Sequence, residues 1–333
     1  MQRRLPCRFV FCAATLLAYI VPAPAQSQQQ SQPSSATMVN ALNGVFGAHS
    51  TFRANHAHGT LLTATFTPAP GAAIISRAPH FAVAATPVLV RFSTFGGIPD
   101  IPDAAPGAAP YGLSLKFMLA GDRETDLVMH SFNGFPSATA ADFVDFLTAM
   151  GNSPAGAARP TPLERYADLH PPAKAYLAAL KPAPSSFITQ PYFGVNTFKF
   201  TNAAGEISHG RYRMVPLGTA QYISAATQAS AAADYLRKQM DAQLAMGPVQ
   251  MRLQLQLAGP DDVLEDPSVA WPEARELVDL GVLTIRGAAD DAGMRERTVV
   301  FMPDELPDGI EAADPMIAAR TRAYAESLER RLK

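Results

Sequence analysis

The chain has 333 residues, of which 48% are hydrophobic, and it carries 27 Lys and Arg against 29 Asp and Glu, a net charge of -2. This length and apolar content supply a sizeable core for one large domain or two. The slightly acidic balance and the lack of a long basic run exclude nucleic-acid binding as the main function.

The first 25 residues have the pattern of a signal peptide. Three Arg residues precede the apolar run FVFCAATLLAYIV, and APA at 23–25 forms a cleavage site of small residues. The apolar run is too short to span a membrane, so we expect no stable membrane insertion. The pattern predicts export to a bacterial periplasm, and a retained membrane anchor is the alternative.

The expected mature chain starts near Gln26. Both cysteines, Cys7 and Cys12, fall in the removed segment, so the mature chain has no disulfide and no thiol chemistry. Removal also takes three basic residues, which leaves 24 basic against 29 acidic residues and a net charge of -5. Residues 26–37, QSQQQSQPSSAT, are low in complexity and expected to be disordered. Residues 38–333 are then expected to form a single domain.

Strand patterns dominate the first part of the mature chain. A short helix and loop are expected over 39–55, and frequent Gly, Pro and Asp make 95–110 a loop. β-branched and apolar residues favour strands elsewhere, and their spacing indicates an antiparallel meander. These strands are expected at 60–67, 87–94, 111–119 and 126–131, with a mixed segment at 72–82.

Helices and further strands follow. Thr139 is the expected N-cap of a helix over 140–150, and Gly205 supplies the turn of a hairpin. Strands clustered first, interposed helices and a helical end predict an α+β protein with an antiparallel barrel or sheet. The remaining expected elements are a less regular helix over 162–180, hairpin strands at 197–201 and 208–216, a long helix over 220–246, strands at 251–257 and 281–286, and a loop at 287–297.

The last twenty residues, DPMIAARTRAYAESLERRLK, read as a helix that begins near Pro315. Arg320 and Tyr324 are four residues apart, so they lie on one face of this helix, one turn apart. A guanidinium at that distance favours the charged phenolate over the phenol. A phenolate can ligate ferric iron, and Tyr is the haem ligand of one enzyme class. A surface pair without function is the alternative for these two residues.

The phrase RANHAHG at 53–59 contains two histidines. On a strand, His56 and His58 would share a face and supply half of a metal site. A zinc site needs a third ligand, and no other histidine is at a suitable spacing. A hydrogen-bonded structural role for His56 is the alternative.

Taken together, these phrases resemble the haem catalase superfamily, most of all the short catalase-related peroxidases, whose chains end soon after the tyrosine that ligates iron. The resemblance runs from about residue 40 to the C-terminus. It implies a catalase-like antiparallel β-barrel with surrounding helices and haem b buried beside the barrel. The matching phrases are RANHAHG at 53–59, RFSTFGG at 91–97, YGLSLKF at 111–117, DLV at 126–128, DPSVAWP at 266–272, LGVLTI at 280–285, LPDGIE at 306–311 and DPMIAARTRAY at 314–324.

The resemblance also implies a role for individual residues. Tyr324 becomes the proximal iron ligand, with Arg320 holding it as phenolate. His56 becomes the distal acid and base, supported by a hydrogen bond with Ser93, and passes a proton between the two oxygens of peroxide. Three arginines match those that pair with the haem propionates, and two phenylalanines match positions beside the macrocycle or simply belong to the core. These residues are Arg53, Arg91 and Arg331, and Phe135 and Phe143.

Some positions depart from the family pattern. Catalases place an Asn two residues beyond DLV, where this chain has His130, which we therefore include in the catalytic set; Asn133 is a nearby substitute. Asn55 stands where catalases have an apolar residue, and Tyr111 where the family has Arg. The C-terminal extension of larger catalases is absent. These differences favour a larger reductant over peroxide itself.

We therefore expect a periplasmic haem peroxidase that uses hydrogen peroxide to oxidise small organic donors, with weak catalase activity at most. Three alternatives remain: a monofunctional catalase, a relative that processes organic or lipid hydroperoxides, and a haem-binding protein without turnover. A carrier needs neither His56 with Ser93 nor a tightly held phenolate. Without the long N-terminal arms of larger catalases, a monomer or small homo-oligomer is expected.

Overall fold

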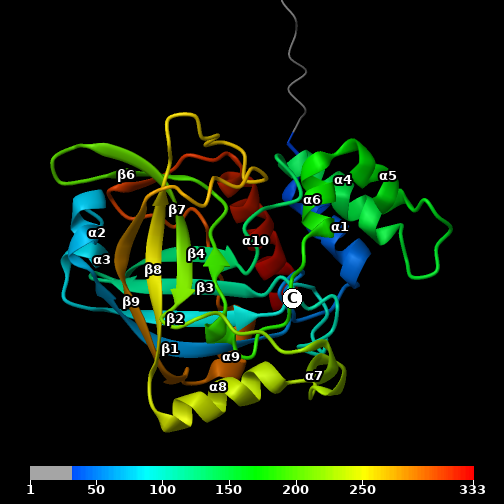
Figure 1. The fold of residues 1–333 in the computed structure, drawn as a ribbon, viewed down its shortest axis with the longest axis horizontal. Coiled ribbons are helices and arrows are strands. Elements are labelled where there is room, and N and C mark those ends of the chain that lie inside the picture. The colour runs from blue at the N-terminus through cyan, green and yellow to red at the C-terminus, as the bar shows by residue number, and fades with distance from the viewer. Residues whose placement is uncertain (1–31) are drawn as a thin grey trace, which may run out of the picture. The chain divides into compact units, whose positions relative to one another are not determined.

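An antiparallel β-barrel forms the centre of the protein (Figure 1). The computed structural model describes residues 32–333, which form one compact unit. The first four strands are a meander, and the pairing of β7 with β8 closes the ring. The ring strands are β1 (Gly59–Pro68), β2 (Thr86–Ser93), β3 (Gly112–Leu119), β4 (Arg123–His130), β5 (Tyr192–Phe193), β7 (Ile207–Pro216), β8 (Val249–Leu257) and β9 (Leu277–Ala288). Two further strands, β6 (Phe198–Thr201) and β10 (Ile310–Ala312), extend the sheet beyond the ring.

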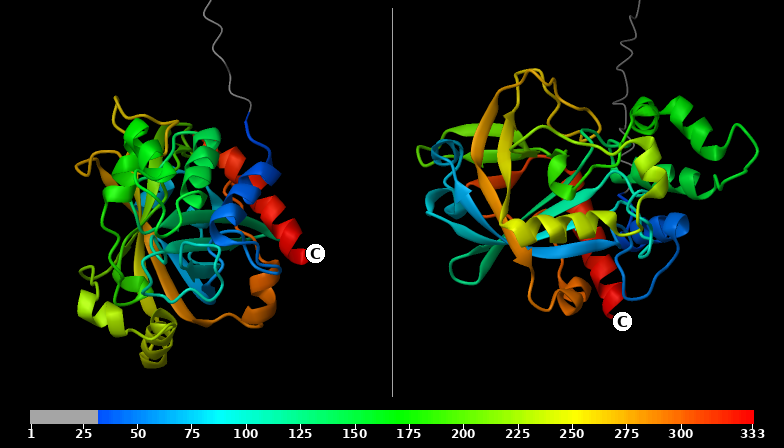
Figure 2. Two further views of the ribbon diagram at one scale, coloured as in Figure 1. Left: turned by 90° about the vertical axis from the view of Figure 1, so that its right-hand side faces the viewer. Right: turned by 60° about the horizontal axis from the view of Figure 1, so that its bottom comes forward.

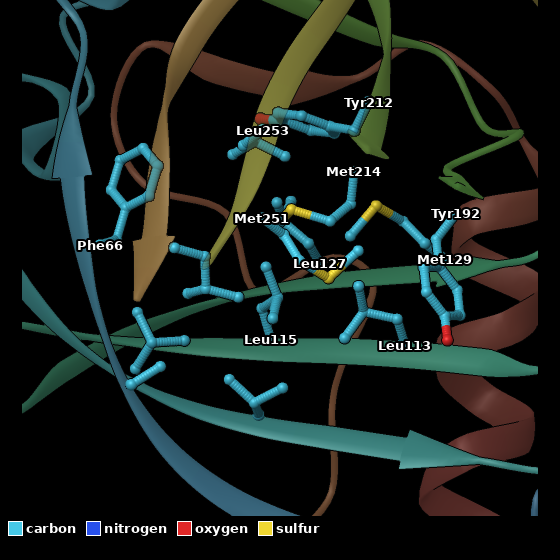
Figure 3. Close-up of a cluster of buried hydrophobic side chains, with 14 of the residues drawn as sticks. Phe66, Leu113, Leu115, Leu127, Met129, Tyr192, Tyr212, Met214, Met251 and Leu253 are labelled. Carbon is cyan, nitrogen blue, oxygen red and sulfur yellow. The ribbon is translucent and has the colours of Figure 1, made fainter. Parts of the chain in front are cut away.

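Successive side chains of strands β3 and β4 point alternately into the barrel and towards its outer face. Leu113, Leu115, Leu127 and Met129 of β3 and β4 point into the barrel and belong to its apolar core (Figure 3). The residues between them face outward, because successive side chains of a strand point to opposite faces. In the observed register Arg91 lies opposite Ser114, and Ser114 opposite Val128, so these outward residues form a row across three strands.

Three helices cover this outer face. They are α1 (Ser35–Phe46), α4 (Ala140–Gly151) and α10 (Met316–Leu332), and each contacts the other two beside the barrel (Figure 2). Thr139 is the N-cap of α4, as expected, because its hydroxyl accepts from the Asp142 amide. The other helices are α2 (Pro70–Ile75), α3 (Pro79–Ala82), α5 (Pro162–Leu169), α6 (Pro171–Ala178), η1 (Phe187–Thr189), α7 (Ala225–Ser230), α8 (Tyr235–Met246) and α9 (Ala292–Thr298).

The long helix predicted over 220–246 is wrong, because α7 and α8 are separate. The backbone amide of Asp103 donates to the Ala233 carbonyl at 2.7 Å, and the Asp103 carboxylate accepts from the Leu236 amide at 2.8 Å. The loop 95–110 therefore takes the hydrogen bonds that a continuous helix would have used and supplies a start for the second helix. The helix propensities of residues 220–246 do not reflect this tertiary contact.

The extent of strand β9 and the helix that follows it also differ from the prediction. The strand expected at 281–286 is longer, because β9 continues past a bulge, where the register shifts and Gly281 has φ +152°. The expected loop 287–297 contains α9, which starts after Asp291 in a left-handed conformation. Glycine and mixed charges hide this helix in the sequence.

At the N-terminal end, α1 begins at Ser35, so the last residues of the segment 26–37 are helical rather than disordered. The hydroxyl of Ser34 accepts from the Thr37 amide and caps this helix. The predicted signal peptide, residues 1–25, lies outside the described residues. Within residues 32–333, no helix combines the length and apolar character needed to cross a membrane.

Candidate active site

A cavity lies on the outer face of the barrel, where β2, β3 and β4 meet the helices α1, α4 and α10. The outward row described above forms its floor, so the strand alternation that fills the barrel also exposes polar groups to this cavity. All ten residues singled out in the sequence line it: Arg53, His56, Arg91, Ser93, His130, Phe135, Phe143, Arg320, Tyr324 and Arg331.

His56 is held in a strained backbone conformation at the edge of this cavity. Its φ of +56° lies in the left-handed region, which a non-glycine residue adopts at a cost of about 1 kcal/mol or more. Its amide donates to the Phe95 carbonyl at 2.9 Å, and the next amide, that of Ala57, donates to Gly96 at 3.0 Å. These two bonds fix the ring's position through the backbone.

The hydrogen bonds of the His56 ring determine its tautomer. Nδ1 lies 2.7 Å from the carbonyl oxygen of Thr94. A carbonyl can only accept, so Nδ1 carries the proton and Nε2 keeps a free lone pair. Burial lowers the pKa of His56 to about 3, and the charge of Arg91 acts in the same direction. The ring is therefore a neutral base at ordinary pH.

Ser93 and Gly112 complete the support of His56. The Ser93 hydroxyl lies 3.0 Å from His56 Nδ1. Gly112 is the direct neighbour of Ser93 across β2 and β3. A Cβ atom at Gly112 would come within 2.5 Å of the Ser93 hydroxyl and 2.7 Å of His56 Nδ1. Only glycine therefore lets the strand approach the ring so closely.

His130 is the second histidine of the cavity. It follows Gly112 in the same cross-strand row, at the end of β4. Both of its ring nitrogens are buried and have no hydrogen-bond partner among the described residues. Burial lowers its pKa to about 3, with Arg320 and His56 acting in the same direction. A buried neutral imidazole has one donor and one acceptor to satisfy, so this position is prepared for a polar ligand.

Tyr324 stands at the end of a chain of polar contacts from α10. Arg320 donates to the Tyr324 hydroxyl oxygen at 2.7 Å, and its other terminal nitrogen donates to the side-chain oxygen of Asn196. The Asn196 amide nitrogen donates in turn to Asp314 at 2.6 Å. The sequence reasoning found Arg320 and Tyr324 but missed Asn196 and Asp314, because no local pattern links residues so far apart in the chain.

Arg53, Arg91 and Arg331 gather at the side of the cavity that faces α9. Arg53 and Arg91 form ion pairs with Glu296, a residue that the sequence reasoning also missed. On the apolar side, the rings of Phe135 and Phe143 lie 5.0 Å apart. The expected grouping of arginines and of aromatic side chains is thus present in the geometry.

Other candidates from the sequence lie elsewhere. His58 does not share partners with His56: its Nδ1 lies 2.9 Å from the Pro99 carbonyl and its Nε2 3.3 Å from Asp103. No cluster of three or more His, Cys, Asp or Glu able to hold a metal occurs in residues 32–333. Asn133 cannot substitute for the usual Asn, because it donates to Glu273 at 3.0 Å and does not line the cavity.

Two further residues that depart from the family pattern, Tyr111 and Asn55, lie in different parts of the structure. Tyr111 is buried and donates to the Asp103 carbonyl at 2.7 Å, so it supports the loop 95–110. Asn55 lines the cavity, and its side-chain oxygen is buried without a partner in the described part of the chain. Asn55 therefore adds a second polar group beside His56.

The fold matches solved catalases. A fungal catalase aligns with a TM-score of 0.74 at 20% identity, over 84% of this chain and 59% of that chain. Catalase A from Saccharomyces cerevisiae aligns with a TM-score of 0.74 at 19% identity, over 84% of this chain and 61% of that chain. This likeness defines the class as a catalase-like β-barrel protein.

Sequence comparison gives the family. The Catalase family model matches residues 50–333. A catalase-related peroxidase from Mycolicibacterium paratuberculosis is 35% identical over 88% of this chain and 93% of its own length. One from Synechococcus elongatus is 30% identical over 89% and 88%. The chain therefore belongs to the catalase family, and the predicted resemblance, fold class and oxidoreductase acting on peroxide are confirmed.

Membership of this family implies haem, and the residues of the cavity fit such a group. Tyr324 offers an oxygen ligand whose partner Arg320 is cationic, and the arginines offer donors for carboxylates. The nitrogens of His130 and the side-chain oxygen of Asn55 show that this cavity contains buried polar groups that no side chain or backbone group of residues 32–333 satisfies.

Proposed function

We propose that this protein is a haem b peroxidase that uses hydrogen peroxide to oxidise small organic donors, with weak catalase activity at most. The observation that carries the proposal is the state of His56, a neutral ring in the cavity with Nδ1 bonded to the Thr94 carbonyl and Nε2 free. A base in this state can accept a proton from peroxide without first losing one. Tyr324, paired with Arg320 in the same cavity, supplies the iron ligand.

Haem, when bound, supplies the iron that exchanges electrons with peroxide and then with the donor. The chain's part is to hold the ligand oxygen and to move a proton. Arg320 holds the Tyr324 oxygen in place through its hydrogen bond and puts a cationic group beside it. His56 Nε2 takes the proton from one peroxide oxygen and returns it to the other, so that the leaving oxygen departs as water. The bond to Thr94 keeps the ring in the tautomer that this transfer needs.

Two features support an organic donor over a second peroxide molecule. His130 and Asn55 place an imidazole and an amide beside His56, which differs from the single Asn expected of catalases. The opposite wall of the cavity is apolar, with Phe135, Phe143 and residues of α1 and α4. Apolar walls with a few polar groups are typical of sites for small organic molecules.

Replacement of His56 tests the proposal. We expect His56→Ala to bind haem normally but to react with hydrogen peroxide about 100-fold or more slowly, the range for general acid–base catalysis. The matched control is His49→Ala, an exposed histidine of the same connecting segment, which should react like the unaltered protein. Stopped-flow absorption gives both rates. Unchanged peroxide kinetics in His56→Ala would contradict the proposal.

The ratio of oxygen released to donor oxidised distinguishes the two enzyme functions. We expect little oxygen from hydrogen peroxide alone and steady oxidation of a phenol such as guaiacol. High oxygen release per peroxide would favour the monofunctional catalase. Faster turnover with an organic hydroperoxide than with hydrogen peroxide would favour a relative that processes organic or lipid hydroperoxides.

The same proposal places the enzyme in the periplasm as a monomer or small homo-oligomer. The signal-peptide pattern of residues 1–25 supports export. Mass spectrometry of protein from the periplasmic fraction should give an N-terminus at Gln26, and light scattering gives the oligomeric state. An uncleaved N-terminus in the membrane fraction would contradict export.

A further inference from the structure

One carboxylate lies among the arginines at the α9 side of the cavity. Arg53 Nη1 donates to Glu296 Oε2 at 2.6 Å and to the Glu296 carbonyl at 2.9 Å. Arg91 Nε lies 3.0 Å from each oxygen of the same carboxylate. We call Arg53, Arg91 and Arg331 the arginine cluster. Glu296 is the acid that neutralises part of its charge.

The third arginine is bound to the same short segment by a different route. Arg331 Nε donates to the Arg297 carbonyl at 2.8 Å, and its terminal nitrogen donates to the Val299 carbonyl. Arg53 also donates to Val299, at 2.8 Å. The end of α9 thus receives hydrogen bonds from Arg53, Arg91 and Arg331, and Figure 2 shows α9 beside the C-terminal end of α10.

The charges at this place do not balance without a ligand. The arginine cluster lines the cavity, whereas no Asp or Glu lines it within residues 32–333, Glu296 included. Three guanidiniums beside one carboxylate leave an excess of two positive charges. Burial lowers the pKa of Arg53, and the nearby charge of Arg91 lowers it further, so their proximity is unfavourable.

Glu296 is ionised in this setting. Burial acts to raise the pKa of Glu296, but Arg91 and Arg53 together lower it by more, and the net shift is downward. Its side chain is 25% exposed, and those of Arg53 and Arg91 are 13% and 4% exposed. Solvent therefore does little to compensate these two arginines, and removal of Glu296 would leave their charges unpaired.

We propose that Glu296 is a stand-in carboxylate: it compensates the arginine cluster in the cofactor-free protein until the two carboxylates of bound haem do so. The proposal rests on the proposed function, because it assumes that haem binds with its carboxylates at this cluster. Glu296 is thus a positioning residue that matters most before the cofactor arrives.

The test compares Glu296→Gln with unaltered protein in haem-free and haem-loaded forms. Without haem, we expect the variant to melt at least about 5 °C lower, because a buried charge loses its partner. With haem, the difference should shrink to less than half. The folded variant should also bind haem roughly tenfold more tightly, because a negative charge near the carboxylates is gone. The control is Glu329→Gln, in an exposed pair with Lys333 on α10, which should change neither quantity.

A second cofactor shows whether the carboxylates are responsible. Haem dimethyl ester keeps the iron and the macrocycle but has no carboxylates. We expect it to leave the melting difference as large as in the haem-free protein. If the ester narrows the difference as much as haem does, or if haem does not narrow it, Glu296 is merely structural and the proposal is overturned.

Two other results are decisive. If Glu296→Gln does not fold without haem, refolding with haem but not with the ester supports the proposal, and failure with both contradicts it. If the unaltered protein binds neither cofactor, as judged by a Soret titration, the proposed function is wrong and this proposal is overturned with it. If the protein binds haem but Glu296→Gln lowers the melting temperature equally with and without haem, this proposal is overturned and the proposed function is not.

Discussion

Arg320 donates a 2.7 Å hydrogen bond to the hydroxyl oxygen of Tyr324, one turn further along α10. The guanidinium is itself fixed by Asn196, which is fixed by Asp314 at the start of the same helix. The order of these contacts means that the position of the candidate iron ligand depends on a buried polar chain rather than on the tyrosine alone. Replacement of any residue of this polar chain should therefore change the position of the Tyr324 side chain.

Replacement of Arg320 by Met should leave the fold intact but weaken the candidate iron ligand. A charge-assisted hydrogen bond is worth about 1.5–3 kcal/mol, so we expect the rate of reaction with hydrogen peroxide to fall about 10- to 100-fold. The absorption bands of ferric haem should shift as well, since the ligand oxygen loses its cationic partner. The control is Arg322→Met, an exposed residue two positions along α10. An unchanged spectrum and rate in Arg320→Met would contradict this role.

The pH dependence of the peroxide reaction follows from the pKa of His56. Because burial lowers that pKa to about 3, the base is unprotonated well below the ordinary histidine value of about 6.5. We expect the second-order rate constant to be flat between pH 5 and pH 8. Stopped-flow measurements across this range check it. A fall in rate centred near pH 6.5 would mean that His56 titrates normally and is not the buried base described above.

His80 gives a prediction about stability alone. It lies outside the cavity, with its ring 4.1 Å from that of Phe81 and 4.9 Å from that of Phe117, and burial lowers its pKa to about 3. As pH falls from about 6.5 towards 3, the unfolded chain binds a proton at His80 that the folded state does not. His80 therefore lowers the free energy of unfolding by about 1.4 kcal/mol per pH unit in this range.

Replacement of His80 by Phe should remove that dependence. Between pH 7 and pH 5 the free energy of unfolding should fall about 2 kcal/mol less in the variant than in the unaltered protein. Urea unfolding at both pH values measures the difference, and peroxide kinetics serve as the control because they should not change. The same pH dependence in both proteins would show that His80 titrates equally in the folded and unfolded states.

Gly112 should tolerate no side chain. A methyl group there meets Ser93 and His56 at less than 3 Å, so Gly112→Ala must move the ring or the strand at a cost of about 1–3 kcal/mol. We expect at least a tenfold loss of peroxide reactivity with haem still bound. Gly287→Ala is the matched control, because a Cβ atom at that position of β9 has open space. Full activity in Gly112→Ala would show that the close packing is dispensable.

The sequence allowed much of the barrel to be predicted, because the segments that form β1 to β4 are rich in β-branched and apolar residues. The ten candidate site residues could be named because they lie in short phrases that resemble the family. The structure brings these residues together in one cavity, while their individual roles stay predictions.

Several of the missed features depend on long-range contacts. Asn196 and Arg320 are 124 residues apart in the chain, and Glu296 and Arg53 are 243 apart. No periodicity marks such a pair before the chain is folded. The break between α7 and α8 has the same origin, since it depends on Asp103 in a distant loop.

The central claim is that His56 and Tyr324 act together on peroxide at bound haem. It is tested most directly by the visible spectrum of the haem-loaded protein, recorded before and after one equivalent of hydrogen peroxide and again after addition of guaiacol. We predict that the Soret band loses intensity on addition of peroxide and recovers as guaiacol is oxidised. A Soret band that is present but unaffected by peroxide would contradict the claim and favour a haem-binding protein without turnover.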